Sequence, residues 1–186
     1  MPLIIVLVII AVVFVWMWFS YNNIVRLRNR RQNAFADIDV QLRQRHDLVP
    51  QLVETVKGYA GHEREVLSRV TEARSSAIAA TTISDKIEKE QQLTSALQGL
   101  RVTMEAYPNL KANENFMSLQ EKLSEIEYTL AGTRRNFNAI TTDYNNAVQT
   151  FPGNMVARNY GFTTESFFDL GTEARKQFEE PPVVKF

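Results

Sequence analysis

Histidines and carboxylates are the side chains in this sequence that could do acid–base or metal chemistry. There are two histidines, His46 and His62, and no cysteine. Zinc sites need ligands at set spacings such as H-E-x-x-H, and neither histidine begins such a motif. The segment "HERE" at residues 62–65 places His62 beside acidic residues, as any helix of mixed charge can. We therefore expect no metal site and no cofactor.

The carboxylates do not form a catalytic pair either. Asp37 and Asp39 lie two residues apart in a helical pattern, so they face different directions and are better suited to ion pairs with nearby arginines or to solvation. The sequence has no G-x-S-x-G motif and no glycine-rich loop after a strand. It predicts no catalytic residue and no small-molecule substrate. An enzyme that uses His46, His62 and nearby carboxylates with a metal is the weakest functional alternative.

The composition narrows the choice of partners. The 186 residues include 21 Lys plus Arg and 21 Asp plus Glu, whereas nucleic-acid binders usually carry a basic excess. The lack of cysteine excludes disulfides, thiolate zinc sites and cysteine nucleophiles. We expect a lipid bilayer as one partner, a homo-oligomer as the assembly, other membrane proteins as further partners, and no nucleic acid.

An apolar segment at residues 3–19, LIIVLVIIAVVFVWMWF, predicts a membrane anchor. At about 1.5 Å per residue it spans roughly 25 Å, and the helix can continue past Ser20 to complete a crossing. The segment lacks the basic start and the small-x-small cleavage site of a signal peptide, so we expect residues 1–20 to be retained as outward tip and transmembrane helix. Aromatic residues at its end are expected at the membrane interface: Trp16, Trp18, Phe19 and Tyr21.

Four arginines follow the apolar segment and bear on its orientation. Because basic residues near a span stay in the cytoplasm, they predict a short N-terminus outside and a cytoplasmic domain. The alternatives are that they solvate a helix face, which can also be true, or that the domain lies on the periplasmic side. The arginines are Arg26, Arg28, Arg30 and Arg31.

Apolar residues recur at steps of three and four from Tyr21 to Tyr59, which predicts one long helix with one buried stripe. Arg31 and Arg45 fall within that stripe. Such arginines either extend their charge to solvent or pair with carboxylates of a neighbouring helix. Pro50 predicts either a kink or a new helix that starts near Asp47.

Three more helices follow in the pattern. They cover about 62–80, a segment that ends before Pro108, and a long stretch of 113–151 capped by Asn113. Residues 21–152 thus predict an all-α fold, an antiparallel bundle of about four helices that continues from the transmembrane helix. The inward stripe of the last helix contains Phe116, Leu119, Leu123, Ile126, Leu130, Thr133, Phe137, Ile140, Tyr144, Val148 and Phe151.

Residues 153–186 predict an irregular tail that is rich in aromatic residues. Its apolar surface must be covered, either by the bundle, by a neighbouring subunit or by the membrane surface. The candidate oligomer contacts are Phe162, Phe167, Phe168, Phe178 and Phe186.

Two similar segments, "YNNIV" at 21–25 and "YNNAV" at 144–148, raise a further possibility. If the two long helices are antiparallel neighbours, Asn22 and Asn145 lie at the same end and can bond across the interface. The alternative is coincidence.

Three long segments resemble the bacterial LemA family. They are "YNNIVRLRNRRQNAFADIDVQLRQRHDLVPQLVETVKGYAGHE", "YPNLKANENFMSLQEKLSEIE" and "RRNFNAITTDYNNAVQTFPGNMVARNYGF", and the likeness extends over residues 21–168. Phe35 stands where many members have tryptophan. The resemblance implies a membrane helix with a short outward terminus, here in a bacterial inner membrane, followed by a helical domain. It implies no catalytic activity.

These observations favour a membrane-anchored helical scaffold that acts through protein–protein contacts and self-assembles. Copies confined to one bilayer gain effective concentration, so weak lateral contacts suffice. The alternative is a membrane-remodelling element, in which arrays of bundles impose curvature.

Overall fold

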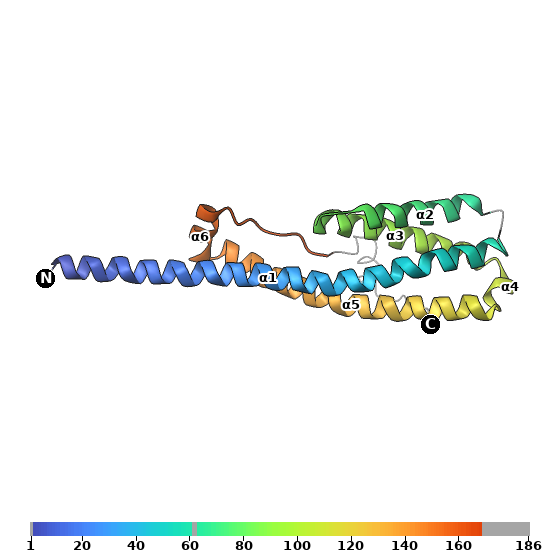
Figure 1. Ribbon diagram of the computed structural model, residues 1–186, viewed down its shortest axis with the longest axis horizontal. Helices are drawn as coiled ribbons and strands as arrows, with labels where there is room; N and C mark the ends of the chain where they lie inside the picture. The colour runs from blue at the N-terminus through green and yellow to red at the C-terminus, as the bar shows by residue number, and fades with distance from the viewer. Residues whose placement is uncertain (1, 61–62, 169–186) are drawn as a thin grey trace, which may run out of the picture. The chain divides into compact units, whose positions relative to one another are not determined.

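The computed structural model describes residues 2–60 and 63–168, and every regular element in this part of the chain is a helix (Figure 1). The predicted all-α class is confirmed. The helices are α1 (Pro2–Lys57), α2 (Arg64–Ala79), α3 (Ile83–Met104), α4 (Pro108–Lys111), α5 (Glu114–Gln149) and α6 (Gly153–Tyr160).

The chain divides into two compact units, and α1 and α5 each contribute to both. Of the described residues, unit 1 contains 2–38 and 132–167, and unit 2 contains 39–60, 63–131 and Phe168. This division differs from the predicted segments 1–20, 21–152 and 153–186. The expectation of an irregular tail from residue 153 is wrong for its first eight residues, which form α6 because Val156 and Ala157 bury an apolar face.

In unit 1, α1 and α5 pack antiparallel. Ile24 shares a core with Tyr144 and Val148, and further along α1 the Phe35 ring meets the Phe137 ring edge-on at 5.7 Å. Contacts that move forward on α1 therefore move backward on α5. The antiparallel pairing of the two long helices is as predicted.

The core of unit 2 draws on five helices. A hydrophobic cluster there joins α1, α2, α3, α4 and α5, and α2 and α3 pack closely as neighbours. The buried members include Val49, Leu52, Val70, Leu93, Leu100, Leu110 and Phe116. This part of the chain is the predicted helical bundle, with the four-residue α4 as an unpredicted addition.

Two features explain where the helices begin and continue. The Asn113 side chain accepts a hydrogen bond from the backbone N–H of Phe116 at 3.0 Å, so it caps α5 as predicted. Pro50 lies inside α1, which continues to Lys57, and the alternative of a new helix near Asp47 is wrong.

The inward stripe of α5 is correct for its central residues and wrong at its end. Phe116, Leu130, Phe137 and Tyr144 are buried, whereas Phe151 is 77% exposed and lies beyond the end of the helix. The chain turns at Phe151 into α6, so the helical period no longer decides which way this side chain points.

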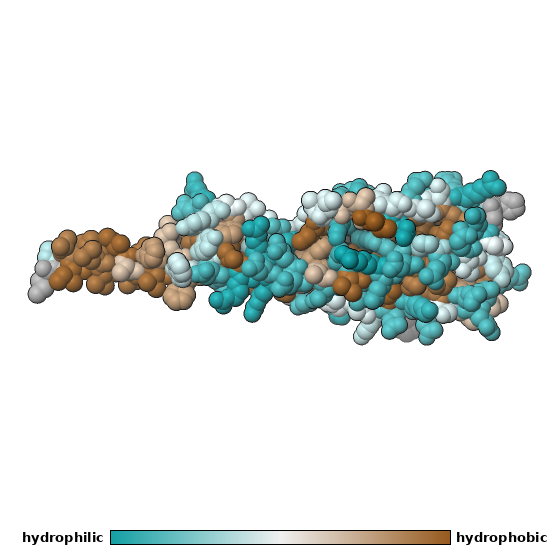
Figure 2. Space-filling view, in the orientation of Figure 1, coloured by the Kyte–Doolittle hydropathy of each residue, from teal (hydrophilic) through white to brown (hydrophobic). Residues whose placement is uncertain are grey.

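The N-terminal part of α1 is apolar on the face that Figure 2 shows, and residues 3–19 contain no charged side chain. An 18-residue window of this helix has a mean hydropathy of 3.0, and none of it is buried by the rest of the chain. By length and composition α1 can cross a membrane, and a bilayer would cover the apolar side chains that the protein leaves exposed.

Candidate functional site

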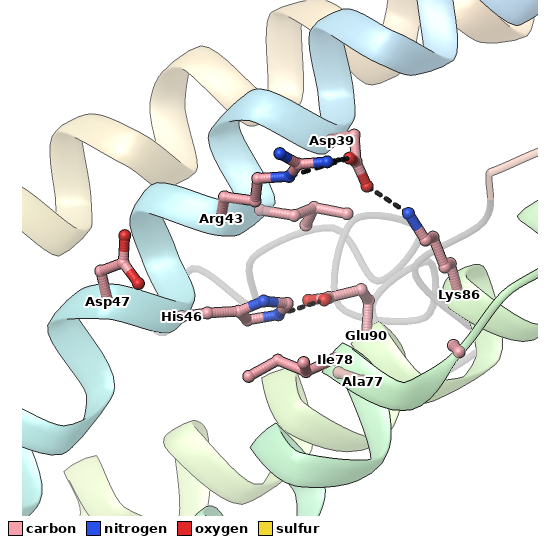
Figure 3. A pocket seen from close by; sticks show the side chains of 10 residues that line it. Asp39, Arg43, His46, Asp47, Ala77, Ile78, Lys86 and Glu90 are labelled. Carbon is pink, nitrogen blue, oxygen red and sulfur yellow. Dashed lines mark hydrogen bonds and ion pairs between the residues drawn. The ribbon is translucent and has the colours of Figure 1, made fainter.

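An open cleft in unit 2, of about 320 Å³, is lined by charged side chains from α1 and α3 (Figure 3). Asp39 binds Lys86 of α3 at one end, and it also accepts hydrogen bonds from Arg43 at 2.9 and 3.1 Å. Burial alone would raise the pKa of Asp39, but the bonds and charges of Lys86 and Arg43 outweigh it and hold that pKa below its ordinary value.

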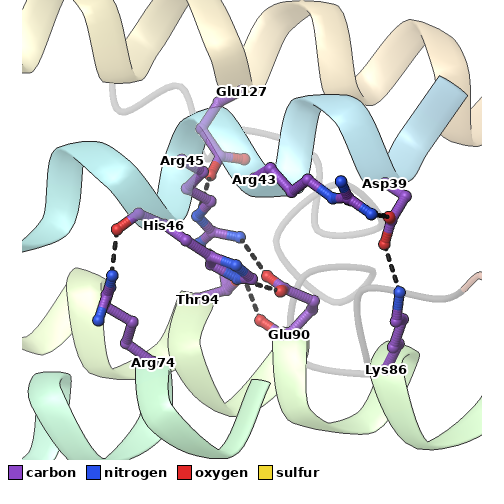
Figure 4. A network of polar contacts seen from close by, with 9 residues as sticks. All are labelled: Asp39, Arg43, Arg45, His46, Arg74, Lys86, Glu90, Thr94 and Glu127. Carbon is purple, nitrogen blue, oxygen red and sulfur yellow. Dashed lines mark hydrogen bonds and ion pairs between the residues drawn. The ribbon is translucent and has the colours of Figure 1, made fainter. Parts of the chain in front are cut away.

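A buried network of charges lies beside the cleft and centres on Arg45 (Figure 4). The Arg45 side chain is 1% exposed, and its Nη1 lies 3.3 Å from Glu90 Oε2 on α3. Its Nη2 donates to Thr94 Oγ1 at 2.9 Å, and its Nε is 3.0 Å from Glu127 Oε1 on α5, an ion-pair contact without hydrogen-bond geometry. Arg45 thus joins α1 to both α3 and α5.

His46 completes the network. Its Nε2 lies 2.5 Å from Glu90 Oε1, so a proton must sit between these two atoms. Arg45 carries one positive charge against the two carboxylates Glu90 and Glu127.

The neighbouring backbone shows why Pro50 does not break α1. Proline has no N–H, so the carbonyl four residues earlier, that of His46, loses its helical donor. Arg74 of α2 fills this role, because its Nε donates to the His46 carbonyl oxygen at 2.7 Å. The proline is thus accommodated by a side chain from another helix.

In unit 1 a second buried arginine binds the C-terminal segment. Arg31 is 4% exposed; its Nη1 lies 3.2 Å from Glu165 Oε2, and its Nη2 donates to the Ser166 carbonyl at 3.0 Å. Its guanidinium also lies 4.8 Å from the centre of the Phe137 ring. Burial lowers the pKa of Arg31 and Glu165 opposes this, but a guanidinium keeps its charge in either case.

The same segment is held by two side chains of α5. Asn145 donates to the Glu165 carbonyl at 3.0 Å and accepts from the Glu165 N–H at 2.8 Å. The Tyr144 hydroxyl donates to the Thr163 carbonyl at 3.0 Å. Residues 163–166 are therefore held on α1 and α5 by main-chain bonds, and the Glu165 carboxylate adds an ion pair with Arg31.

Chemically, both clusters consist of groups that neutralise one another. Within residues 2–60 and 63–168, no group of three or more His, Asp or Glu side chains is placed to hold a metal ion. The arrangement can fix helices and the C-terminal segment in register.

Comparison with known proteins agrees with this architecture. The sequence profile of the LemA family matches residues 34–186. The chain belongs to the LemA family. Protein LemA of Metamycoplasma hominis is 30% identical over 149 residues, which cover 79% of this chain and 68% of that protein.

More distant relatives carry another name. The magnetosome protein MamQ of Magnetospirillum gryphiswaldense is 22% identical over 174 residues, and a MamQ of Paramagnetospirillum magneticum is 21% identical over the same length. The matches cover 80% of this chain and 64% of each relative. Together with the apolar α1, they describe a membrane-associated helical protein.

The structure decides between the two alternatives for Arg31 and Arg45, the arginines within the apolar stripe of α1. Of the two alternatives, pairing with carboxylates is correct, since Glu90, Glu127 and Glu165 bind them. Among the four arginines after the apolar segment, Arg31 is thus buried in an ion pair, whereas the other three are exposed: Arg26, Arg28 and Arg30. Their role in topology stays a prediction.

The expected bond between Asn22 and Asn145 is wrong. Asn22 donates to the Trp18 carbonyl in its own helix at 2.9 Å, and Asn145 binds Glu165 instead. A carbonyl one helical turn away is always within reach of an asparagine, so similar sequence at two helix ends does not bring the two side chains together.

The predicted interface aromatics divide into two groups. Trp18 and Phe19 are exposed, whereas Trp16 stacks on Phe151 with ring centres 6.3 Å apart. Tyr21 packs against Tyr160 at 4.8 Å and Phe162 at 5.8 Å.

The candidate oligomer contacts also differ from one another. Phe168 is buried and Phe162 is partly buried by this chain itself. Phe167 is nearly half exposed, and Phe178 and Phe186 lie outside the described residues, as does His62.

Sequence reasoning missed the acidic partners. Glu90 and Glu127 lie in helices of mixed charge and look like their solvated neighbours. The signal in the sequence came from their partners, because arginines that interrupt an apolar stripe require a carboxylate from another part of the chain.

Removal of the central carboxylate should destabilise unit 2. We expect Glu90→Ala to lower the free energy of unfolding by about 3–5 kcal/mol, because it leaves Arg45 buried with one partner fewer. Glu88→Ala on the same helix, where the carboxylate is 63% exposed, is the control and should change it by less than about 0.5 kcal/mol. Denaturant unfolding of the detergent-solubilised protein measures both, and equal losses would contradict the assignment.

The Asp39 cluster predicts a dependence on acid. Because the folded-state pKa of Asp39 is lowered, its contribution is complete above the unfolded value of about 3.9 and is lost as pH falls through the lower folded value. Asp39→Asn should therefore reduce stability at pH 6 but flatten the loss of stability between pH 5 and pH 3. An unchanged slope in thermal unfolding over that range would rule the ion pair out as its source.

Proposed function

We propose that this LemA-family chain is a membrane-anchored helical scaffold that acts through protein–protein contacts and self-assembles at the membrane, without catalysis. The observation that carries the proposal is an open groove in unit 2, of about 360 Å³, lined from α1, α3 and α5. Its walls contain Leu52, Leu97, Met104 and Leu123.

The groove combines apolar walls with charged and amide side chains. Arg101, Gln98, Gln120 and Glu127 also line it, which is the composition of a site for an amphipathic helix. When a partner covers an apolar groove, its apolar surface leaves water, and this lowers the free energy of the complex. Anchoring through α1 raises the local concentration of copies in one bilayer, so modest contacts can hold an assembly together.

Orientation is the second part of the proposal. The exposed Arg26, Arg28 and Arg30 follow the apolar segment and support an N-terminus outside and a helical domain in the cytoplasm of a bacterial inner membrane.

The natural lack of cysteine makes this orientation testable. In intact spheroplasts, a membrane-impermeant maleimide should label Pro2→Cys and leave Ala139→Cys unlabelled until the membrane is opened. Ala139 is an exposed residue of α5, so its labelling depends only on whether the reagent reaches the side of the membrane on which it lies. Labelling of Ala139→Cys from outside would place the domain on the periplasmic side.

The groove can be blocked with a bulky side chain. Gln98 is exposed and lines the groove. In lipid nanodiscs or mild detergent, Gln98→Trp should shift the protein towards monomers and raise the apparent dissociation constant of the oligomer about tenfold or more. Ser95→Trp, exposed on the same helix but not part of the groove, is the matched control and should leave the oligomer intact.

Mass photometry across a concentration series measures the distribution. If the unmodified protein is monomeric throughout, self-assembly is refuted. If Gln98→Trp and Ser95→Trp behave alike, the groove is not the contact.

A further inference from the structure

We propose that the corner between α5 and α6 in unit 1 is a second lipid-contacting site, which inserts into the boundary between headgroups and acyl chains beside α1. The site consists of Phe151, Met155 and Tyr160. It rests on the membrane anchoring of α1, and the partner is the bilayer itself rather than another protein.

Ring contacts fix the level of this corner along α1. Phe151 stacks on Trp16, which lies inside the apolar segment 3–19, and Tyr160 packs on Tyr21, just beyond its end. Trp16 and Tyr21 are five residues apart, or about 7.5 Å along the helix. The corner and α6 therefore lie beside the last turn of the apolar segment and the first residues after it.

The exposed side of α6 and the residues before it carry apolar side chains beside the polar Asn154, Arg158 and Asn159. Val156 and Ala157 are buried against the Ile24, Tyr144 and Val148 core, with Met17 of the apolar segment packed on the same cluster. On the outside, Phe151 is 77% exposed and Met155 is 58% exposed. A corner that turns a phenylalanine and a methionine outward, at the level of a membrane segment, matches an interfacial helix.

The length of the anchor supports the same depth. If the lipid ended on the N-terminal side of Trp16, only residues 3–15 of α1 would be embedded. They span about 20 Å of helix, whereas the hydrocarbon core of a bilayer is about 30 Å thick. Trp18 and Phe19, exposed at the level of the corner, would then face water. If lipid reaches Phe19, the corner is immersed with it, and the first exposed arginine, Arg26, lies about 10 Å further out, at headgroup level.

Close packing holds the corner in place. A Cβ added to Gly153 would lie 2.0 Å from the Ala147 carbonyl oxygen, so only glycine allows α6 to fold back so tightly on the end of α5. The tight return keeps α6 beside α1, where Phe151 stacks on Trp16 and Tyr160 packs on Tyr21.

Spin labels on a chain without natural cysteines test the depth directly. Phe151→Cys and Met155→Cys are labelled in the full-length protein, reconstituted in phosphatidylcholine–phosphatidylglycerol vesicles. Leu7→Cys, within the apolar segment, is the lipid reference, and Ala139→Cys, exposed on α5, is the water reference. Power saturation with oxygen and with a water-soluble nickel chelate measures contact with lipid and water.

We expect oxygen to exceed the nickel chelate severalfold as a collision partner at residues 151 and 155, as at residue 7, with the reverse ratio at residue 139. Nickel access at residue 151 equal to that at residue 139 would overturn the inference while residue 7 still reports an intact anchor. Protection from both reagents would also overturn it, because another protein copy would then cover the corner. Water access at residue 7 would remove the anchor and this inference together.

Discussion

Buried positive charge on α1 is the constraint on which the rest of the structure depends. A guanidinium withdrawn from water without a partner costs several kcal/mol, so Arg31 and Arg45 can occupy the inner stripe only where carboxylates meet them. Arg45 takes its partners from α3 and α5, and Arg31 takes Glu165 from the C-terminal segment. Apolar side chains alone would tolerate a shift by one turn, whereas these charges permit one register in each unit.

Features of the fold that depend on local sequence could be predicted, whereas the partners of buried charges could not. The stripes of α1 and α5 are long and periodic, so both helices, their antiparallel pairing and the cap at Asn113 follow from local sequence. The identity of the acidic partners does not, because Glu90 and Glu88 lie two residues apart and differ only in which face of α3 they occupy. Helix α6 was missed because eight residues after a proline and a glycine carry too little periodicity to distinguish a helix from a turn.

Function follows from what each unit leaves exposed. Unit 1 presents an apolar span and an aromatic corner, which we propose as surfaces for lipid. Unit 2 presents a groove with apolar walls and polar side chains, which we propose as a surface for a partner helix. The groups that could do acid–base chemistry, His46 and Glu90, face each other and Arg45 in the interior, where they serve the packing of the helices.

A double-mutant cycle between Arg45 and Glu90 tests the central claim most directly. Arg45→Met and Glu90→Leu are measured singly and together by denaturant unfolding, while Glu127, whose side chain is 36% exposed, stays solvated. The account predicts that each single variant lowers the free energy of unfolding by about 3–5 kcal/mol. The double variant should lower it by less than the sum of the two single losses, with a difference, the coupling energy, of about 3 kcal/mol or more. Losses that simply add would show that the two charges do not depend on each other, and would contradict the account.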